Sequence, residues 1–322
     1  MFGRRILAAL AAAALMVGAA RAEEIKELNF GLVSTEKAGA LKQMWAPFLE
    51  DLGKAAGVQV NGFFATDYTG IIEAQRFNKV QLAWYGNMAA IEAVDRADGE
   101  VFAQFVDLDG TPGYYSYIIT HKDSGITSLD QVLKNAKAYT FGIGDPESTS
   151  GTLVPTYYVF TKNHLDPQTH FKVVRSSNHE GNFLAVLNRQ VDLATCNSEI
   201  TQKMKEVAPD KLAQIRILWT SPLIPRDPLV WRKDLPADLK ARIRDFVVGN
   251  GKTPREKEVL KNLYRLSGFK ASSDAQLIPI RQLELAKERT KFLNDEHMSE
   301  ADKKARIGEI DAKLAELTKQ AN

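Results

Sequence analysis

Segments typical of β-strands and α-helices alternate along this chain, and this order restricts the fold more than any other feature. In residues 28–32, LNFGL, apolar positions alternate with small or polar ones, as in a strand with one buried face. Residues 36–57 have helical spacing and end at Gly57, a residue type that is common just after helices. Another strand pattern, VQLAWYG, occupies residues 80–86. This order predicts parallel sheets covered by helices.

A second series of the same kind begins near residue 113. Residues 113–121, GYYSYIITH, have the pattern of a strand that leaves the first unit. Further strand and helix patterns follow up to residue 197, and after residue 235 the chain has helical spacing almost to its end. Two α/β units in one chain predict two lobes.

The two lobes can be assigned to ranges of the chain. We predict that residues 23–120 and 226–322 form the first lobe and that residues 121–225 form the second. The chain crosses between the lobes near residues 118–122 and returns near residues 220–228, which makes a hinge of two segments. Ligands of α/β proteins bind outside the carboxyl ends of strands, so we expect a site between the lobes.

Residues 1–22 have the three parts of a secretory signal peptide. Arg4 and Arg5 precede an apolar run over residues 6–20, and the sequence Ala-Arg-Ala follows at positions 20–22. The run is too short to span a bilayer, so we predict a cleaved signal and export to the periplasm. Removal of three arginines changes the formal net charge from +2 to −1. That near-neutral balance does not indicate a nucleic-acid partner.

The cysteine and histidine content predicts no disulfide and no metal site, and we expect no cofactor. The single cysteine, Cys196, cannot form an internal disulfide, so the fold depends on a sizeable core in which we expect Cys196 to be packed. The five histidines are not spaced like metal ligands, and the HEGNF segment at His179 lacks the second histidine of H-E-x-x-H.

Three hydroxyl-bearing residues, Ser148, Thr149 and Ser150, stand just before an apolar run with helical spacing. One of them can cap a helix that begins near Thr152, which contributes about 1 kcal/mol, but a cap needs only one hydroxyl. The first helical turn leaves N–H groups unpaired and carries partial positive charge, which small residues allow an anion to reach. The hydroxyl triplet (Ser148–Ser150) is therefore compatible with a cap, with a site for a tetrahedral dianion, or with a nucleophile.

An enzymatic interpretation makes Ser148 or Ser150 the nucleophile, with His179 and Asp227 completing a triad. The local sequence E-S-T-S-G differs from the G-x-S-x-G elbow of serine hydrolases. We therefore predict that the protein is not an enzyme, and a secreted serine hydrolase is the alternative from a different class.

Longer segments carry a family resemblance that extends over nearly the whole mature chain. They are LNFGLVSTE, FFATDYTGIIEAQRFNKVQLAWYGN, EAVDRADGEVFAQ, GDPESTSGTLVPTYYVF, SPLIPRDPLVWRKDL and FKASSDAQLIPIRQL. In these segments the chain resembles the periplasmic phosphonate-binding proteins of ABC phosphonate importers, within the wider phosphate, phosphite and phosphonate-binding family. The resemblance implies a type II periplasmic binding protein fold, with two α/β lobes and a two-segment hinge, and a membrane permease as partner.

The resemblance also implies which residues hold the phosphonate group. In that family a Ser-Thr-Ser run at a helix N-terminus binds it, which corresponds to Ser148–Ser150 here. A histidine after the next strand also donates to the phosphonate, and His179 matches that position. Two tyrosines that face the ligand correspond to Tyr68 and Tyr114.

The other end of the implied site carries carboxylates. Family members that prefer 2-aminoethylphosphonate use two acids to receive the ligand ammonium, and Glu199 and Asp227 match them. Arg226 stands where the family pattern has glycine, and an arginine there can pair with the ammonium-binding acid. Within the family the alternative ligands are phosphite, methylphosphonate and phosphate, and a bound form that signals to a receptor is a further alternative to transport.

The end of the chain, residues 277–322, is charged and has helical spacing. Ile307, Ile310, Leu314 and Leu317 recur at intervals of three and four residues and form a narrow apolar seam. The seam either packs on its own lobe or pairs with a second subunit, so the sequence allows a homodimer through the C-terminal helices.

Overall fold

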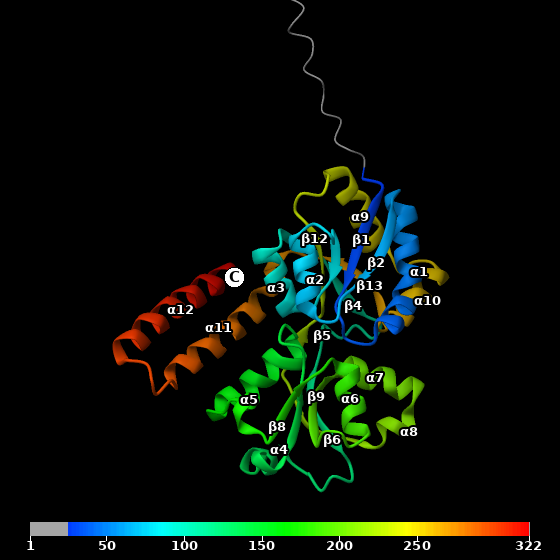
Figure 1. The fold of residues 1–322 in the computed structure, drawn as a ribbon. Coiled ribbons are helices and arrows are strands. Elements are labelled where there is room, and N and C mark those ends of the chain that lie inside the picture. Colours follow the sequence, from blue (N-terminus) through cyan, green and yellow to red (C-terminus); the bar gives the residue numbers. More distant parts are fainter. Residues whose placement is uncertain (1–24, 322) are drawn as a thin grey trace, which may run out of the picture.

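Two α/β lobes make up the body of the molecule, and a pair of helices projects from it (Figure 1). The computed structural model describes residues 25–321, and the predicted signal peptide lies outside these residues. Each lobe is built around one β-sheet, and a two-stranded ribbon connects the lobes. The α/β class predicted from the alternation of patterns is therefore confirmed.

The first lobe contains a six-stranded sheet with the strand order β13-β4-β12-β3-β1-β2. Its strands are β1 (Glu27–Leu32), β2 (Gln59–Phe64), β3 (Leu82–Trp84), β4 (Gly99–Asp107), β12 (Pro228–Arg232) and β13 (Leu266–Ala271). Its helices are α1 (Ala38–Ala56), α2 (Tyr68–Arg76), α3 (Asn87–Arg96), α9 (Ala237–Gly249) and α10 (Pro254–Asn262). As predicted, α1 ends at Gly57, whose φ of 69° is left-handed and suits glycine.

The sheet of the first lobe is mixed rather than parallel, which differs from the prediction. β1 runs parallel to β2 and β3, but β12 runs antiparallel to β3 and β4. The chain leaves the first lobe after β4 and returns to it at β12. β12 therefore starts at the end of the sheet where β4 finishes, and the two strands run in opposite directions. A parallel pair would need a crossover connection between them.

The second lobe contains a five-stranded sheet with the order β10-β6-β9-β7-β8. Its strands are β6 (Ser116–His121), β7 (Thr140–Ile143), β8 (Val173–Ser176), β9 (Leu193–Asn197) and β10 (Ile215–Thr220). This sheet is also mixed rather than parallel, because β7 runs parallel to β8 and β9 but β6 runs antiparallel to β9 and β10. Its α-helices are α4 (Leu129–Lys134), α5 (Pro167–His170), α6 (His179–Leu187), α7 (Ser198–Val207) and α8 (Pro209–Leu212). Cys196 is fully buried in the core of this lobe, as predicted.

The connection between the lobes is an antiparallel ribbon of β5 (Gly113–Tyr114) and β11 (Ile224–Pro225). The predicted lobe boundary at residue 120 instead falls inside β6, a strand of the second sheet, so the outward crossing lies earlier in the chain than residues 118–122. The hinge strand and β6 are separated only by Tyr115, and one continuous strand-like pattern in the sequence covers both. The return at β11 lies within the predicted residues 220–228.

Stacked aromatic rings extend from the core of the first lobe to the interface between the lobes. The rings of Trp45 on α1 and Trp84 on β3 lie 5.5 Å apart, and Trp84 is 6.1 Å from Phe105 on β4. All three side chains are buried. Trp84 is the last residue of β3, so the packed rings hold its indole N–H rigidly at a strand end, where the site lies.

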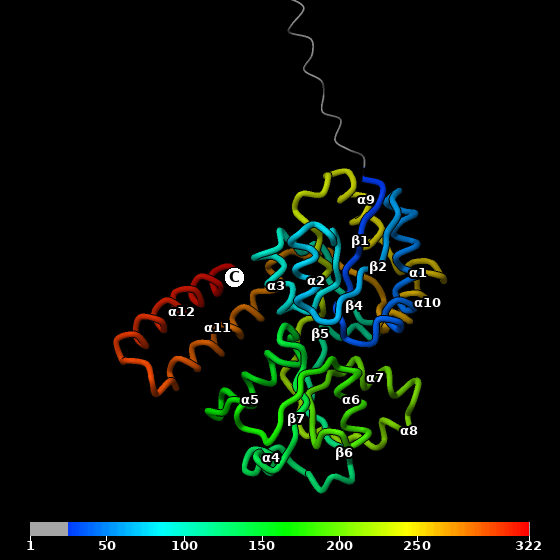
Figure 2. The backbone as a smooth tube through the Cα atoms, in the orientation of Figure 1, coloured from blue at the N-terminus to red at the C-terminus, as the bar shows by residue number. Residues whose placement is uncertain are grey.

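The C-terminal hairpin, α11 (Ile278–Leu293) and α12 (Glu300–Ala321), extends away from both lobes (Figures 1 and 2). Ile310 of the predicted seam is buried, and Arg289 pairs with Asp311 at 2.6 Å between the two helices. Ile310 therefore packs within the hairpin, while Ile307, Leu314 and Leu317 are partly buried, and the homodimer stays a prediction. Among residues 25–321, no helix has the length and apolar character needed to cross a membrane.

Candidate functional site

The residues predicted to bind a ligand converge at the interface between the lobes. Seven of the eight are buried and the last, Glu199, is partly buried. They come from strand ends and helix starts of both lobes: Tyr68, Tyr114, Ser148, Thr149, Ser150, His179, Glu199 and Asp227. Such convergence outside strand ends is the usual place of a ligand site in α/β proteins.

The hydroxyl triplet begins a helix, but earlier and with a wider turn than predicted. Ser148 is the cap, and its Oγ accepts a hydrogen bond from the N–H of Gly151 at 3.0 Å. The helical segment starts at Thr149 rather than at Thr152, and its first turn, Thr149–Leu153, is a π-helix. Leu153 N–H donates to the Ser148 carbonyl at 3.1 Å, five residues back. Single π-turns are rare in helices and are frequently found at functional sites.

Pro155 explains how this wide turn is anchored. Proline has no N–H, so carbonyls one turn before it lose their usual intrahelical donor. The carbonyl of Ser150 accepts instead from the Ser116 hydroxyl at 2.6 Å, and that of Gly151 accepts from Gly144 N–H at 3.0 Å. The helix start is thereby fixed to the sheet of the second lobe.

The two lobes are in direct contact around the triplet. At the start of α2, the N–H of Tyr68 donates to Asp145 Oδ2 at 3.1 Å. Near the start of α3, the N–H of Met88 donates to Thr149 Oγ1 at 2.8 Å. Unpaired N–H groups at helix starts require acceptors, and here the second lobe supplies them to the first. The site is therefore in a closed arrangement.

His179 faces the two serines as a neutral ring. Its Nε2 lies 3.2 Å from Ser150 Oγ and 3.4 Å from Ser148 Oγ. Burial lowers the pKa of His179 to about 4, so the imidazole is uncharged at neutral pH. Within residues 25–321, Nδ1 has no hydrogen-bond partner, whereas a serine triad needs a carboxylate there. The triad with Asp227, the enzymatic alternative, does not form.

Two buried phenols connect the ends of the site. Tyr68 lies close to Ser148, and Tyr114 lies close to both Ser150 and Asp227. Burial raises the pKa of both tyrosines well above their usual range, so each keeps its proton. A protonated phenol can donate a hydrogen bond to an anion.

Asp227 is a buried acid with one oxygen available. Its Oδ2 accepts from the indole N–H of Trp84 at 2.9 Å, and among the described residues its Oδ1 has no hydrogen-bond partner. Burial, and next the charge of Glu199, raise the pKa of Asp227 to about 8. A buried carboxylate oxygen without a donor is poised to accept one from a ligand.

Glu199 lies close to Asp227, but both of its oxygens are occupied. Oε1 forms an ion pair with Arg226, and Oε2 accepts from Asn197 Nδ2 at 3.1 Å. Arg226 also lies 3.1 Å from Asp107. The expected pairing of Arg226 with an acid is thus present, although its partner is Glu199 rather than the adjacent Asp227. Both predicted acids lie at the site, but of the two only Asp227 has a carboxylate oxygen without a hydrogen-bond partner among the described residues.

Sequence reasoning missed several polar partners of the site. Asp145 follows a strand and lies inside a family motif, so its position contained a usable signal. The sequence predicts Trp84 at a strand end near the cleft or hinge, where it lies, but not its contact with Asp227. Asp107 ends β4 and gives no motif that distinguishes it from other surface acids. The Met88 N–H is a backbone group, so the residue type at position 88 could not indicate its contact with Thr149.

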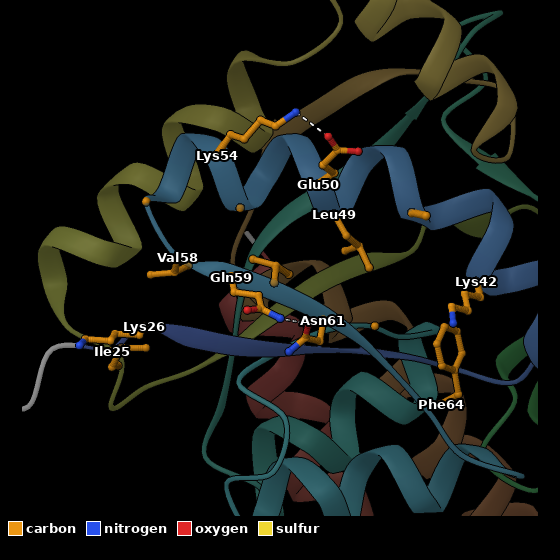
Figure 3. A pocket seen from close by; sticks show the side chains of 15 residues that line it. Ile25, Lys26, Lys42, Leu49, Glu50, Lys54, Val58, Gln59, Asn61 and Phe64 are labelled. Atoms are coloured by element: carbon orange, nitrogen blue, oxygen red, sulfur yellow. Dashed lines mark hydrogen bonds and ion pairs between the residues drawn. The ribbon is translucent and has the colours of Figure 1, made fainter.

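A groove of about 850 Å³ lies elsewhere, between α1 and the edge strand β2 (Figure 3). Its wall includes Lys54, which pairs with Glu50 at 2.6 Å, and Gln59, which bonds to Asn61 at 2.9 Å. None of the eight predicted ligand residues lines this groove.

Comparison with known proteins agrees with this geometry. The family model of phosphonate ABC transporter periplasmic substrate-binding proteins matches residues 30–277. The phosphonates-binding periplasmic protein of Escherichia coli (strain K12) is 53% identical over 300 residues, which cover 93% of this chain and 88% of that protein. The chain belongs to this family. Its members are substrate-binding components of ABC transporters, which is consistent with the incomplete serine triad.

Solved structures support the same fold. The binding protein of an ABC phosphonate transporter from Pseudomonas aeruginosa is 51% identical, with a TM-score of 0.90, and covers 92% of this chain and 98% of that one. A protein of Prochlorococcus marinus (MIT 9301), solved in complex with methylphosphonate, is 20% identical, with a TM-score of 0.72, and covers 80% and 97% of the two chains. The predicted periplasmic binding protein fold with a helical C-terminal region is confirmed.

Proposed function

We propose that this protein captures 2-aminoethylphosphonate in the periplasm and delivers it to the permease of an ABC transporter. The observation that carries this proposal is the buried Oδ1 of Asp227, which has no hydrogen-bond partner among residues 25–321, in the same site as the hydroxyl triplet. One end of the site suits an anion and the other suits a cation, as a zwitterion requires.

The anion end is built from neutral donors. The hydroxyl triplet, the His179 ring and the Tyr68 phenol meet at the start of a helix, where backbone N–H groups add partial positive charge. A phosphonate dianion offers three oxygens to such donors. Each charge-assisted hydrogen bond contributes about 1.5–3 kcal/mol net before ordering costs.

The cation end has an excess of negative charge. Asp107, Glu199 and Asp227 surround a single guanidinium, that of Arg226. In this cluster Asp227 provides the direct acceptor for the ligand ammonium, while Glu199 is held by Arg226 and contributes to the negative potential. An alkylphosphonate without an amine leaves Asp227 buried and unpaired, which is costly and therefore discriminates against such ligands.

Transport follows from closure of the lobes. Ligand contacts to both lobes favour the closed state, which presents a surface of both lobes to the permease. The proposal needs no metal, cofactor or covalent step. A homodimer through α11 and α12 remains part of the proposal as a separate prediction.

Calorimetric titration with 2-aminoethylphosphonate, ethylphosphonate, methylphosphonate, phosphite and phosphate tests the ligand. Ethylphosphonate is the matched control because it lacks only the amine. We expect 2-aminoethylphosphonate to bind at least about tenfold more tightly than ethylphosphonate, a difference of one charge-assisted contact. Equal or tighter binding of phosphate or phosphite contradicts the proposed ligand. Release of product during the titration would instead favour the hydrolase.

A further inference from the structure

One face of α7 carries charged residues that all reach outside the second lobe. Glu199, Lys203 and Glu206 are spaced by four and three residues, so they lie along the same side of the helix. Each forms an ion pair with a residue beyond the second sheet: Glu199 with Arg226, Lys203 with Glu36, and Glu206 with Arg265. We call these three contacts the α7 ion-pair row.

Along the α7 ion-pair row, the charges alternate in sign both on α7 and on the residues that face it. On α7 they are negative, positive and negative, and the facing side chains are positive, negative and positive. The row therefore matches only one register of α7 against the first lobe. Since the partners lie on either side of the lobe interface, opening of the lobes would separate them.

The middle pair of the row, Lys203–Glu36, is less exposed to solvent than the pair Glu206–Arg265 at its end. The Glu36 side chain is 0% exposed and that of Lys203 is 31% exposed, whereas Arg265 and Glu206 are 34% and 45% exposed. Exposed pairs contribute little, because water screens both charges. A carboxylate fully removed from water, by contrast, is stable only while it keeps its partner. Glu199 and Arg226 are also well buried, but Arg226 directly follows the hinge strand β11 and is paired with Asp107 as well. Of the two pairs that lie away from the hinge strand, Lys203–Glu36 is therefore the one on which closure depends more.

Glu36 has no other source of compensation among residues 25–321. It lies in the loop after β1, its Oε1 has no hydrogen-bond partner, and Lys203 is its one salt-bridge partner. Burial raises its pKa, and nearby Glu180 and Glu199 act in the same direction. Closure without the ammonium group of Lys203 would bury an unpaired acid among other acids.

We propose that Lys203 and Glu36 are positioning residues of the ligand site, whose ion pair stabilises the closed state and so strengthens binding of any phosphonate. This inference rests on the proposed function, because phosphonate binding is its readout. It differs from the ammonium contact assigned to Asp227, because the loss of the pair affects ligands with and without an amine equally.

Four variants test the pair in titrations with 2-aminoethylphosphonate and ethylphosphonate. Lys203→Met removes the charge but keeps the unbranched stem, and Lys203→Arg restores a positive charge. Lys205→Met is the matched control, because Lys205 is an exposed neighbour on α7. Glu36→Gln removes the partner charge, and thermal unfolding checks that each variant is folded.

We expect Lys203→Met to weaken the binding of both ligands by about the same factor, about 10- to 100-fold. Lys203→Arg should restore at least half of the lost binding free energy. Lys205→Met should leave the affinity for both ligands unchanged. Binding of a folded Lys203→Met within about twofold of the unchanged protein overturns the inference. So does a Glu36→Gln variant that loses affinity only for 2-aminoethylphosphonate, since Glu36 then contacts the ammonium itself.

The two proposals fail in different ways. If the unchanged protein binds neither phosphonate, the proposed function is wrong and this inference falls with it. If the unchanged protein binds both ligands and Lys203→Met binds them equally well, only the role of the ion pair is wrong.

Discussion

Replacing Asp227 with Asn separates the two ends of the proposed site. The substitution keeps the size of the side chain and retains an oxygen that can accept from the Trp84 indole, now 2.9 Å from Oδ2. It replaces the free Oδ1 with an amide N–H₂ group, a donor that faces the ligand ammonium, which is also a donor. The phosphonate end, at Ser148–Ser150 and His179, is left unchanged.

The magnitude follows from one charge-assisted contact. Its loss costs about 1.5–3 kcal/mol, which corresponds to about 10- to 150-fold weaker binding of 2-aminoethylphosphonate. Ethylphosphonate makes no such contact, and the neutral amide spares the closed site the cost of burying Asp227 without a partner, whether as a charge or as a protonated acid. We therefore expect its affinity in Asp227→Asn to be unchanged or higher, so that selectivity for the amine is largely lost.

Calorimetric titration of both ligands into both proteins measures this selectivity directly. Any general weakening of closure or stability affects both dissociation constants equally and therefore cancels in their ratio. Equal losses for the two ligands would show that Asp227 supports the fold of the site rather than the ammonium, and the zwitterion argument would then be refuted.

Three further outcomes are expected. First, burial and the charge of Glu199 raise the pKa of Asp227 to about 8 in the closed site, and a bound ammonium lowers it, so binding of 2-aminoethylphosphonate to the closed site should release protons, and less so as the pH rises above about 8. Titrations in buffers of different ionisation enthalpy measure the release. Asp227→Asn should release fewer protons below that pH, and equal release by the two proteins would contradict the raised pKa. Second, Gly151→Ala places a Cβ 2.8 Å from Ser148 Oγ and 2.9 Å from the backbone of Gly144, so we expect a lower melting temperature and weaker binding of every phosphonate; an unchanged affinity would contradict the described helix start. Third, analytical ultracentrifugation of the mature chain and of a chain that ends at residue 294 tests the homodimer, which predicts a dimer for the first and a monomer for the second; two monomers would refute it.

Local patterns were sufficient for much of the fold and part of the site. Alternation and helical spacing predicted two α/β lobes, and Gly57 marked the end of α1, because these features depend on residues close together in the chain. The hydroxyl triplet was recognisable at a helix start for the same reason. The pattern could not show the wide π-turn there, since that turn depends on Ser116 and Gly144 taking up the carbonyls that Pro155 leaves free.

The antiparallel return of β12 and the position of the hinge also lay beyond local patterns. One continuous strand-like run covers both β5 and β6, and the division between them exists because β5 pairs with β11, 110 residues later in the chain. Pairing over such a separation depends on which strands meet in space rather than on residue type.

The chain's residue types and spacing allowed an anion site at a helix start, and its longer motifs showed the resemblance to a family, which implied acids at the opposite end. They could not tell which acid is free. Asp227 meets Trp84 across 143 residues and Glu199 meets Arg226 across 27, so the assignment of each charge to its partner arises only when the lobes fold and close. Burial then determines the consequence, because a carboxylate removed from water must find a partner, and at Asp227 the remaining partner is the ligand.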